Sequence, residues 1–340
     1  MDDTPNLFAQ QAKNRRQSRW LIAAFLLFFT WLGLGGDLLA YGLTADSPPG
    51  HYHHVFPWFG VLMLGIGIAF ARWGWTSGSK AVLWSTGARE VTTPTTPAEQ
   101  QLVDVVDEMA IAAGIPRPRL YIINDPDPNA FSTGNDPSAS SIAVTTALLS
   151  LCSRDELQAV IGHEMGHIKN FDVRLMTLLA TLVGMVAIMS HGLRRILFQS
   201  SGGGSRSSKN LGAVWFLVLV IWLVSWILAP ILTQLMAMAV SRKREYLADA
   251  MSAQFTRNPT ALASALQKIE RPNAVPSVIT GGAAHLCIAD PLGRDASTRD
   301  GWLADFLGTH PPIRLRIARL NAMGYQAGAP SIAPAPQPAA

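Results

Sequence analysis

Two histidines and a glutamate stand together in the run His163-Glu164-Met165-Gly166-His167. Residues four apart lie on one face of an α-helix, so His163 and His167 can bind one metal ion. Glu164 points about 100° away around the helix, beside the open coordination position. Zinc polarises a bound water molecule, and a neighbouring carboxylate can accept the proton of that water. The spacing therefore predicts a hydrolytic zinc site rather than two solvated histidines on a helix surface.

A catalytic zinc site needs a third protein ligand. A third histidine on the pattern H-E-x-x-H-x-x-G-x-x-H is absent, because Asn170 and Val173 occupy the positions of the required glycine and histidine. Glu245 and Asp249 lie one helical turn apart, so Glu245 can bind the metal while Asp249 orients a histidine ligand. The alternative is a basic helix beside the membrane whose charges are solvated. We predict Glu245 as the third ligand.

Local signals predict the elements that position these residues. Ser153-Arg154-Asp155-Glu156 is a capping-box pattern, so the helix that carries the histidines should begin there and run to about Asn170. A second helix is predicted from apolar residues at helical spacing over residues 97–113. Short strand-like runs separated by turn-forming residues lie at 120–123, 130–132 and 141–145. These signals predict an α+β domain that is mostly α.

Two long apolar segments precede this domain. Residues 20–40 would span about 30 Å as a helix, which is the thickness of a bilayer core and too long for a cleaved signal peptide. Residues 55–73 form the second segment, and aromatic side chains lie at both of its ends. Positive charges gather at residues 13–19, whereas residues 44–54 contain no Lys or Arg. The positive-inside rule therefore predicts a retained hairpin with both ends in the cytoplasm.

Two further apolar segments, residues 175–190 and 211–240, follow the zinc motif. The second is long enough to cross a bilayer and the first is short. The loop at 191–210 contains Lys and Arg, which conflicts with a position outside the membrane. A second membrane hairpin, a pair embedded in the cytoplasmic leaflet and a buried helical pair all remain open, and we favour the hairpin.

These signals divide the chain into five parts. They are an N-terminal transmembrane hairpin (1–75), a first part of the protease domain with the zinc-motif helix (76–170), a second hydrophobic hairpin (171–240), a second part of the protease domain with the third ligand (241–326) and a disordered tail (327–340).

The composition agrees with a membrane protein. Charged residues make up 15% of the chain and hydrophobic residues 49%, whereas soluble domains carry about 25% charged residues. A net charge of +4 without a basic stripe argues against nucleic acid as a partner. The two cysteines, Cys152 and Cys287, exclude a disulfide framework and a four-cysteine metal site, and we interpret Cys152 as a small buried side chain.

Other polar residues give weaker signals. Asp37 is the only charge in the first apolar segment, near its outer end, and we expect it to face water. His51, His53 and His54 lie in the short loop between the first two segments, and we interpret them as a solvated interfacial cluster.

Four segments in this order resemble the integral-membrane zinc endopeptidases of the HtpX type, which are relatives of the CAAX prenyl proteases. They are the zinc-motif helix at 156–167, the Asn-Ala-Phe segment at 128–134, the third-ligand helix at 241–249 and the His-Pro-Pro segment at 309–317. The resemblance covers about residues 1 to 325. The Gly/Ser-rich loop and the Pro-rich tail look like additions.

The resemblance implies membrane-spanning helices with a gluzincin-like zinc protease domain and one Zn²⁺ per subunit. It implies that Asn129, Ala130 and Phe131 bind the substrate backbone as an added strand. It also implies that His310 and Arg316 lie near the zinc and stabilise the oxyanion of the tetrahedral intermediate.

The chain is therefore expected to be a membrane-embedded zinc endopeptidase. By resemblance it hydrolyses misfolded or damaged membrane proteins in envelope quality control and stress response. It is expected to be a multi-pass protein of a bacterial-type inner membrane, with the lipid bilayer and membrane-protein or peptide substrates as partners and a cytoplasmic active site. A CAAX-type processing peptidase and a non-enzymatic membrane scaffold with a structural metal are the alternatives, although a structural zinc normally requires four protein ligands.

Overall fold

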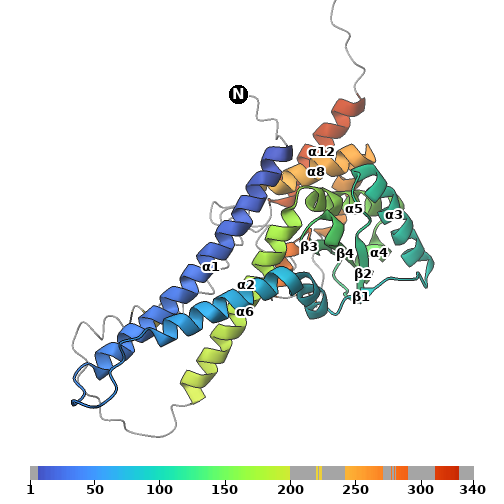
Figure 1. Cartoon of the computed structure of the whole chain (residues 1–340). Helices are drawn as coiled ribbons and strands as arrows, with labels where there is room; N and C mark the ends of the chain where they lie inside the picture. Colours follow the sequence, from blue (N-terminus) through green and yellow to red (C-terminus); the bar gives the residue numbers. More distant parts are fainter. Residues whose placement is uncertain are drawn as a thin grey trace, which may run out of the picture.

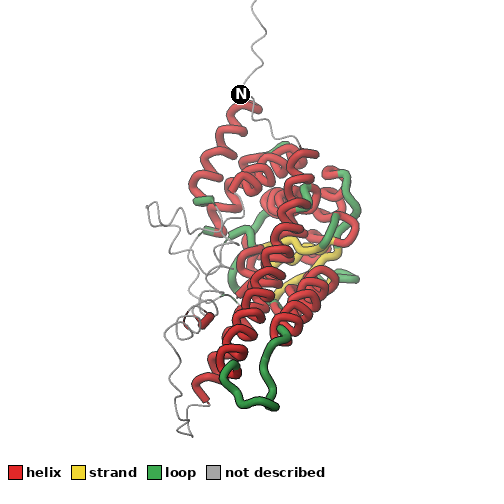
Figure 2. The backbone as a smooth tube through the Cα atoms, turned by 60° about the vertical axis from the view of Figure 1, so that its left-hand side comes forward, coloured by secondary structure: helices red, strands yellow, loops and turns green. Residues whose placement is uncertain are grey.

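The computed structural model of the chain describes residues 7–199, 220, 222–223, 242–270, 277, 279, 281–289 and 311–328. Three long helices extend together away from a domain in which shorter helices surround a small β-sheet (Figure 1). They are α1 (Leu7–Thr44), α2 (Trp58–Ser85) and α6 (Asp172–Gln199). The molecule thus separates into a rod of apolar helices and a mixed domain, which Figure 2 shows from another side.

Helices α1 and α2 form an apolar hairpin. Within the described residues, Asn14–Thr44 and Trp58–Ser85 are long and apolar enough to cross a membrane. The two helices approach closely at Gly33, where an added Cβ would lie only 2.5 Å from the backbone oxygen of Phe59. Large apolar side chains, including those of Trp20, Leu27, Trp58 and Leu62, remain exposed on the outer surface of the hairpin. Such a surface suits a lipid environment.

The prediction that Asp37 faces water is wrong, because its side chain is buried. Its carboxylate accepts hydrogen bonds from the backbone N–H groups of Phe59 (2.9 Å) and Gly60 (2.6 Å) at the start of α2. The residue before α2 is Pro57, whose side chain cannot cap the helix, so Asp37 satisfies these N–H groups from the neighbouring helix. His54 Nε2 lies 2.6 Å from Asp37 Oδ1 and His54 is buried, so its predicted place in a solvated cluster is wrong. His51 and His53 are exposed, as expected.

Helix α2 is continuous across residue 75, where the sequence predicts the end of the membrane hairpin. The part of α2 from Met63 to Trp75 packs with α1 and α6 in one apolar cluster. This cluster includes Phe25, Phe29, Leu178 and Leu182. Its last turns pack against the sheet domain through Val82 and Leu83. The hairpin and the sheet domain therefore share one helix.

Within the described part of the chain, the sheet has four strands in the order β1-β2-β4-β3. The strands are β1 (Arg89–Glu90), β2 (Arg119–Ile123), β3 (Ala130–Gly134) and β4 (Ser140–Thr145). β2 and β4 are parallel, with Leu120 opposite Ile142, whereas β3 pairs antiparallel with β4 and lies at one edge. Figure 2 shows the strands at the centre of the domain.

Short helices surround the sheet. They are α3 (Pro97–Ala113), α4 (Thr146–Leu151), α5 (Arg154–Lys169), α8 (Arg242–Thr256), α9 (Pro259–Ile269) and α12 (Ile313–Gly328), with 3-10 turns η1 (Pro137–Ala139) and η2 (Gly281–Leu286). Thr96 begins α3 by accepting a hydrogen bond from the Glu99 N–H. The main core joins α3, α5, α9 and α12 to strands β2 and β4.

The predicted class, α+β and mostly α, is confirmed. The predicted helix at 97–113 has the observed bounds, and the three predicted strands agree with the observed ones to within two residues. The predicted loop at 191–210 is wrong for residues 191–199, because they continue helix α6 to Gln199. Residues 200–210, most of the predicted segment 211–240 and most of the tail 327–340 lie outside the described residues.

Candidate active site

Helix α5 positions His163, Glu164 and His167. Ser153 and Glu156 form the capping box that the sequence predicts: the Ser153 side chain accepts from the Glu156 N–H, and the Glu156 carboxylate accepts from the Ser153 N–H. Lys268 Nζ, in α9, lies 2.6 Å from the same carboxylate. This cap fixes the start of α5, and the buried apolar face of α5 fixes its rotation toward the core.

Helix α8 crosses α5 at two glycines. A Cβ added to Gly166 would lie 3.2 Å from Ala248 Cα, and one added to Gly162 would lie 3.3 Å from Ser252 Oγ. The close crossing brings Glu245, one turn before Ala248, to the histidine face of α5.

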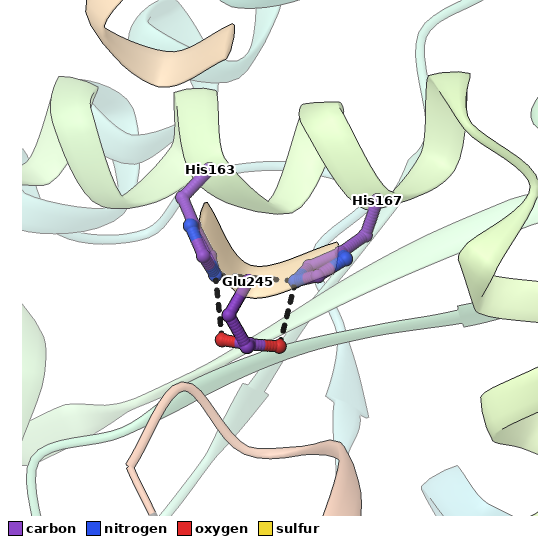
Figure 3. Close-up of side chains that lie close together, drawn as sticks. All are labelled: His163, His167 and Glu245. Carbon is purple, nitrogen blue, oxygen red and sulfur yellow. Dashed lines mark hydrogen bonds and ion pairs between the residues drawn. The ribbon is translucent and has the colours of Figure 1, made fainter. Parts of the chain in front are cut away.

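The three predicted ligands converge (Figure 3). The Nε2 atoms of His163 and His167 lie 3.2 Å apart, and they lie 3.6 Å and 3.4 Å from the two carboxylate oxygens of Glu245. Two nitrogens bound to one zinc ion at about 2.0–2.1 Å in tetrahedral geometry are about 3.3 Å apart. The donor set and its spacing therefore fit a zinc ion, while the role of the three residues as ligands stays a prediction.

A carboxylate stands behind each histidine. Asp249 Oδ1 lies 3.0 Å from His163 Nδ1, as the sequence predicts for a supporting carboxylate. Asp172 Oδ2 lies 3.2 Å from His167 Nδ1, a contact that the sequence analysis missed. Such contacts fix the ring and its tautomer, leaving Nε2 for the metal. The signal for Asp172 was its place just after the motif, at the start of α6.

Arg316 is fully buried beside Asp249. Its Nε and Nη2 donate to the two carboxylate oxygens of Asp249 at 2.9 and 2.7 Å, and Nη1 donates to the backbone oxygen of Ile288 at 3.1 Å. Nη1 also lies 3.3 Å from Glu245 Oε2. The geometry thus holds Arg316 behind the predicted ligands, against the supporting carboxylate, and its predicted oxyanion role stays a prediction.

The buried charges in this cluster depend on one another. Burial opposes the charged forms, but the carboxylates of Asp249 and Glu245 raise the pKa of Arg316, and Arg316 lowers the pKa of Asp249 in return. Burial likewise opposes a charged His167, whereas Asp172 and Glu245 raise the pKa of that imidazole well above its usual value. The carboxylates of Asp249, Glu245 and Asp172 therefore favour positive charge on Arg316 and on the His167 imidazole.

Glu164 lies next to His163 and is 1% exposed. Its Oε2 has no hydrogen-bond partner among the described residues. A buried carboxylate oxygen without a partner is costly in a structural role, so this oxygen suits a group that exchanges a proton with a bound substrate or water.

Another segment of this chain, residues 288–289, contacts the start of β3, the strand that is predicted to bind substrate. The Asn129 side chain donates to the backbone oxygen of Ala289 (2.8 Å), and the Ala289 N–H donates back to Asn129 Oδ1 (3.4 Å). The Ile288 N–H donates to the Ala130 backbone oxygen at 2.9 Å. Residues 288–289 therefore occupy the edge that the sequence assigns to substrate at Asn129 and Ala130.

Further along β3, the outward backbone groups alternate. Phe131 is fully buried in the core and belongs to the ladder with β4, so the structure gives it a packing role. Gly134 N–H donates outward to Thr177 Oγ1 in α6 at 3.1 Å. Between these contacts, the backbone N–H and C=O groups of Ser132 point away from β4. No described residue forms a backbone hydrogen bond with them on that side.

His310, the other predicted oxyanion residue, lies outside the described residues. Cys152 is buried, as expected, and burial raises the pKa of its thiol to about 12. That thiol is therefore inert at neutral pH.

Comparison with known proteins decides the family. The pattern of Peptidase family M48 matches residues 97–324, which include every described residue of the cluster. The chain belongs to peptidase family M48. It is 36% identical over 328 residues to "Protease HtpX homolog" of Caldanaerobacter subterraneus subsp. tengcongensis, covering 93% of this chain and 98% of that protein. It is also 36% identical to the protein of the same description from Streptococcus gordonii, covering 93% and 100%. The crystal structure of S. mikatae Ste24p aligns with 93% of this chain and 66% of that chain, at 16% identity and a TM-score of 0.46.

This M48 peptidase is a membrane-associated metalloprotease, and the resemblance to the HtpX type is confirmed. The family implies a metal ion, and within the described residues His163, His167 and Glu245 form the cluster that could hold one.

Proposed function

We propose that the chain is a membrane-embedded endopeptidase that holds one zinc ion per subunit on His163, His167 and Glu245. The observation that carries this proposal is the convergence of these three donors within 4.8 Å of one another, beside the buried Glu164 carboxylate. Asp249 and Asp172 would orient the two imidazoles through Nδ1.

A zinc ion held by these residues would supply a Lewis acid, which would lower the pKa of a water molecule. Glu164 accepts a proton from the water that attacks the peptide carbonyl carbon, and then donates that proton to the departing amine nitrogen as the C–N bond breaks. The oxygen of the water remains with the new carboxyl group, so the reaction is a hydrolysis.

The zinc assignment predicts different losses for the two acidic residues of α8. Glu245→Ala removes a ligand and should release the metal. Asp249→Ala removes a supporting carboxylate and should weaken zinc binding by about 10–100-fold. Zinc content of the purified full-length variants measures both effects, with the exposed Asp104→Ala as control. Retention of zinc by Glu245→Ala together with its loss from Asp249→Ala would show that the ligand and its supporter are reversed.

We further propose that an extended segment of a misfolded or damaged membrane protein adds to the edge of β3. Edge strands present unpaired backbone groups that bind extended peptides without regard to most side chains, which suits substrates that share only a lack of structure. The outward backbone groups of Ser132 bond no described residue, so pairing would begin there. Ser132 is 5% exposed, so an incoming segment would have to displace what now covers it. Crosslinking of substrates to the inactive Glu164→Gln variant in membranes tests this proposal, and capture of folded soluble proteins alone would contradict it.

We also propose a multi-pass protein of a bacterial-type inner membrane with a cytoplasmic active site. The positive charges before the first span and the absence of Lys and Arg from residues 44–54 support this orientation. Reporter fusions at Ser47 should give an extracytoplasmic signal and fusions at Gly87 a cytoplasmic one. A cytoplasmic signal at Ser47 would overturn the orientation of the hairpin and of the site with it.

A further inference from the structure

The N-terminal end of α1 contacts the turn that follows the zinc-motif helix. Gln11 Nε2 donates to the backbone oxygen of Lys169 at 2.9 Å, and Asn14 Nδ2 donates to that of Asn170 at 2.9 Å. Gln11 and Asn14 are three residues apart, so they share one face of α1. This face satisfies backbone carbonyls at the end of α5, which have no partner within the helix.

Asn14 also reaches the carboxylate behind His167. Its Nδ2 donates to Asp172 Oδ1 at 2.6 Å, while Asp172 Oδ2 lies 3.2 Å from His167 Nδ1. An amide nitrogen has two N–H groups, so Asn14 can donate to both Asn170 and Asp172. Asn14 and Asp172 are both fully buried. Water therefore does not compete for the hydrogen bond between them.

The same turn contains a residue with a strained backbone. Phe171 has φ of 60°, in the left-handed region that non-glycine residues rarely adopt. This conformation reverses the chain between His167 and Asp172, so that Asp172 faces back toward the imidazole. Arg15 of α1 lies over the Phe171 ring at 4.4 Å from its centre. Contacts from α1 therefore surround a turn that would not hold this shape by local preference.

We propose that Asn14 is a positioning residue for the metal site: it holds Asp172 in place, and through Asp172 it orients His167. Arg244 Nη1, 3.8 Å from Asp172 Oδ1, supplies charge to the same carboxylate, but Asn14 is the short, directional contact. The first membrane helix is thereby part of the machinery of the site. This inference rests on the proposed zinc site.

The test compares Asn14→Leu with Asn14→Asp in the full-length chain in detergent. Leucine is similar in size and removes both donors, whereas aspartate keeps the shape and places a second carboxylate against Asp172. Zinc affinity is measured by competition with a chelator in the Glu164→Gln background, where peptide hydrolysis should be strongly reduced. We expect either variant to weaken zinc binding about tenfold, the lower end of the range for supporting partners. In the active background, kcat should fall with KM unchanged, and the absorption bands of the Co²⁺-substituted protein should shift.

Two controls separate positioning from folding. Ala12→Leu changes an exposed residue of the same helix and should leave zinc affinity unchanged. The double variant Asn14→Asp with Asp172→Asn restores one amide-to-carboxylate hydrogen bond, so it should regain stability lost in Asn14→Asp. Its zinc affinity should stay low, because it lacks the carboxylate that orients His167. Wild-type zinc affinity in Asn14→Asp, whether or not Asn14→Leu folds, would overturn the inference. Absence of zinc binding in the otherwise wild-type chain would instead overturn the proposed zinc site.

Discussion

The Glu164→Gln variant should keep its metal and lose peptide hydrolysis by about 10²–10⁴-fold, the usual contribution of a positioned proton-transfer group. Glutamine has nearly the shape of glutamate but cannot accept the proton of the attacking water. Glu164 is adjacent to His163 without belonging to the converging donor set, so the metal should remain. Cleavage of casein, self-cleavage and zinc content of the same preparation measure the two effects together.

Glu108→Gln provides a matched control, because Glu108 makes a surface ion pair with Arg154. Such pairs contribute little to stability, so this variant should retain full activity. Full activity of Glu164→Gln would remove Glu164 from the reaction. Loss of zinc from Glu164→Gln would mean that the carboxylate binds the metal instead of transferring a proton.

The second large effect is expected at Arg316. Arg316→Leu leaves the buried carboxylates of Asp249 and Glu245 without their cation, and the removal of one partner from a buried ion pair costs about 3–5 kcal/mol. The free energy of unfolding of the zinc-free protein should fall by this amount, and zinc affinity should fall as Asp249 loses its position. Denaturant unfolding in detergent and chelator competition measure these changes.

The conservative Arg316→Lys variant distinguishes two roles. Lysine keeps the charge but lacks the planar fork that bonds both oxygens of Asp249. If Arg316 positions Asp249, this variant should lose part of its stability and zinc affinity. A direct oxyanion role predicts lower kcat at full zinc occupancy, with stability unchanged. Arg314→Leu, at an exposed position of α12, should change stability by less than about 0.5 kcal/mol. Equal stability of Arg316→Leu and the wild type would contradict the positioning role.

Local signals predicted much of the fold and of the site. The capping box and the spacing of His163 and His167 act within one helix, so the sequence reveals them directly. The helix at 97–113 and the three strands follow from periodicity and turn residues in the same way.

What the sequence did not reveal depends on contacts between distant segments. Asp37 reads as a lone charge in an apolar run, and only the approach of α2 supplies the N–H groups that it binds. Asn14 and Asp172 are far apart in the chain, so no spacing rule joins them. Arg316 reads as one of several surface arginines until α12 packs beside α8. Polar residues whose partners come from another element are the ones that pattern reasoning misplaces.

A hydrogen bond joins the end of the edge strand β3 to helix α2 at Trp75. Asn135, directly after β3, donates from Nδ2 to the backbone oxygen of Trp75 in α2 at 2.6 Å. From Trp58 to Trp75 the helix rises about 26 Å, at about 1.5 Å per residue, whereas the hydrocarbon core is about 30 Å thick. If α2 crosses the bilayer from Trp58, as we propose, the length of this unbroken helix would place the edge strand close to the membrane surface. On the proposed topology, a polypeptide leaving the bilayer would meet this strand within its first few residues, and a segment farther out would have to fold back toward the lipid to reach it.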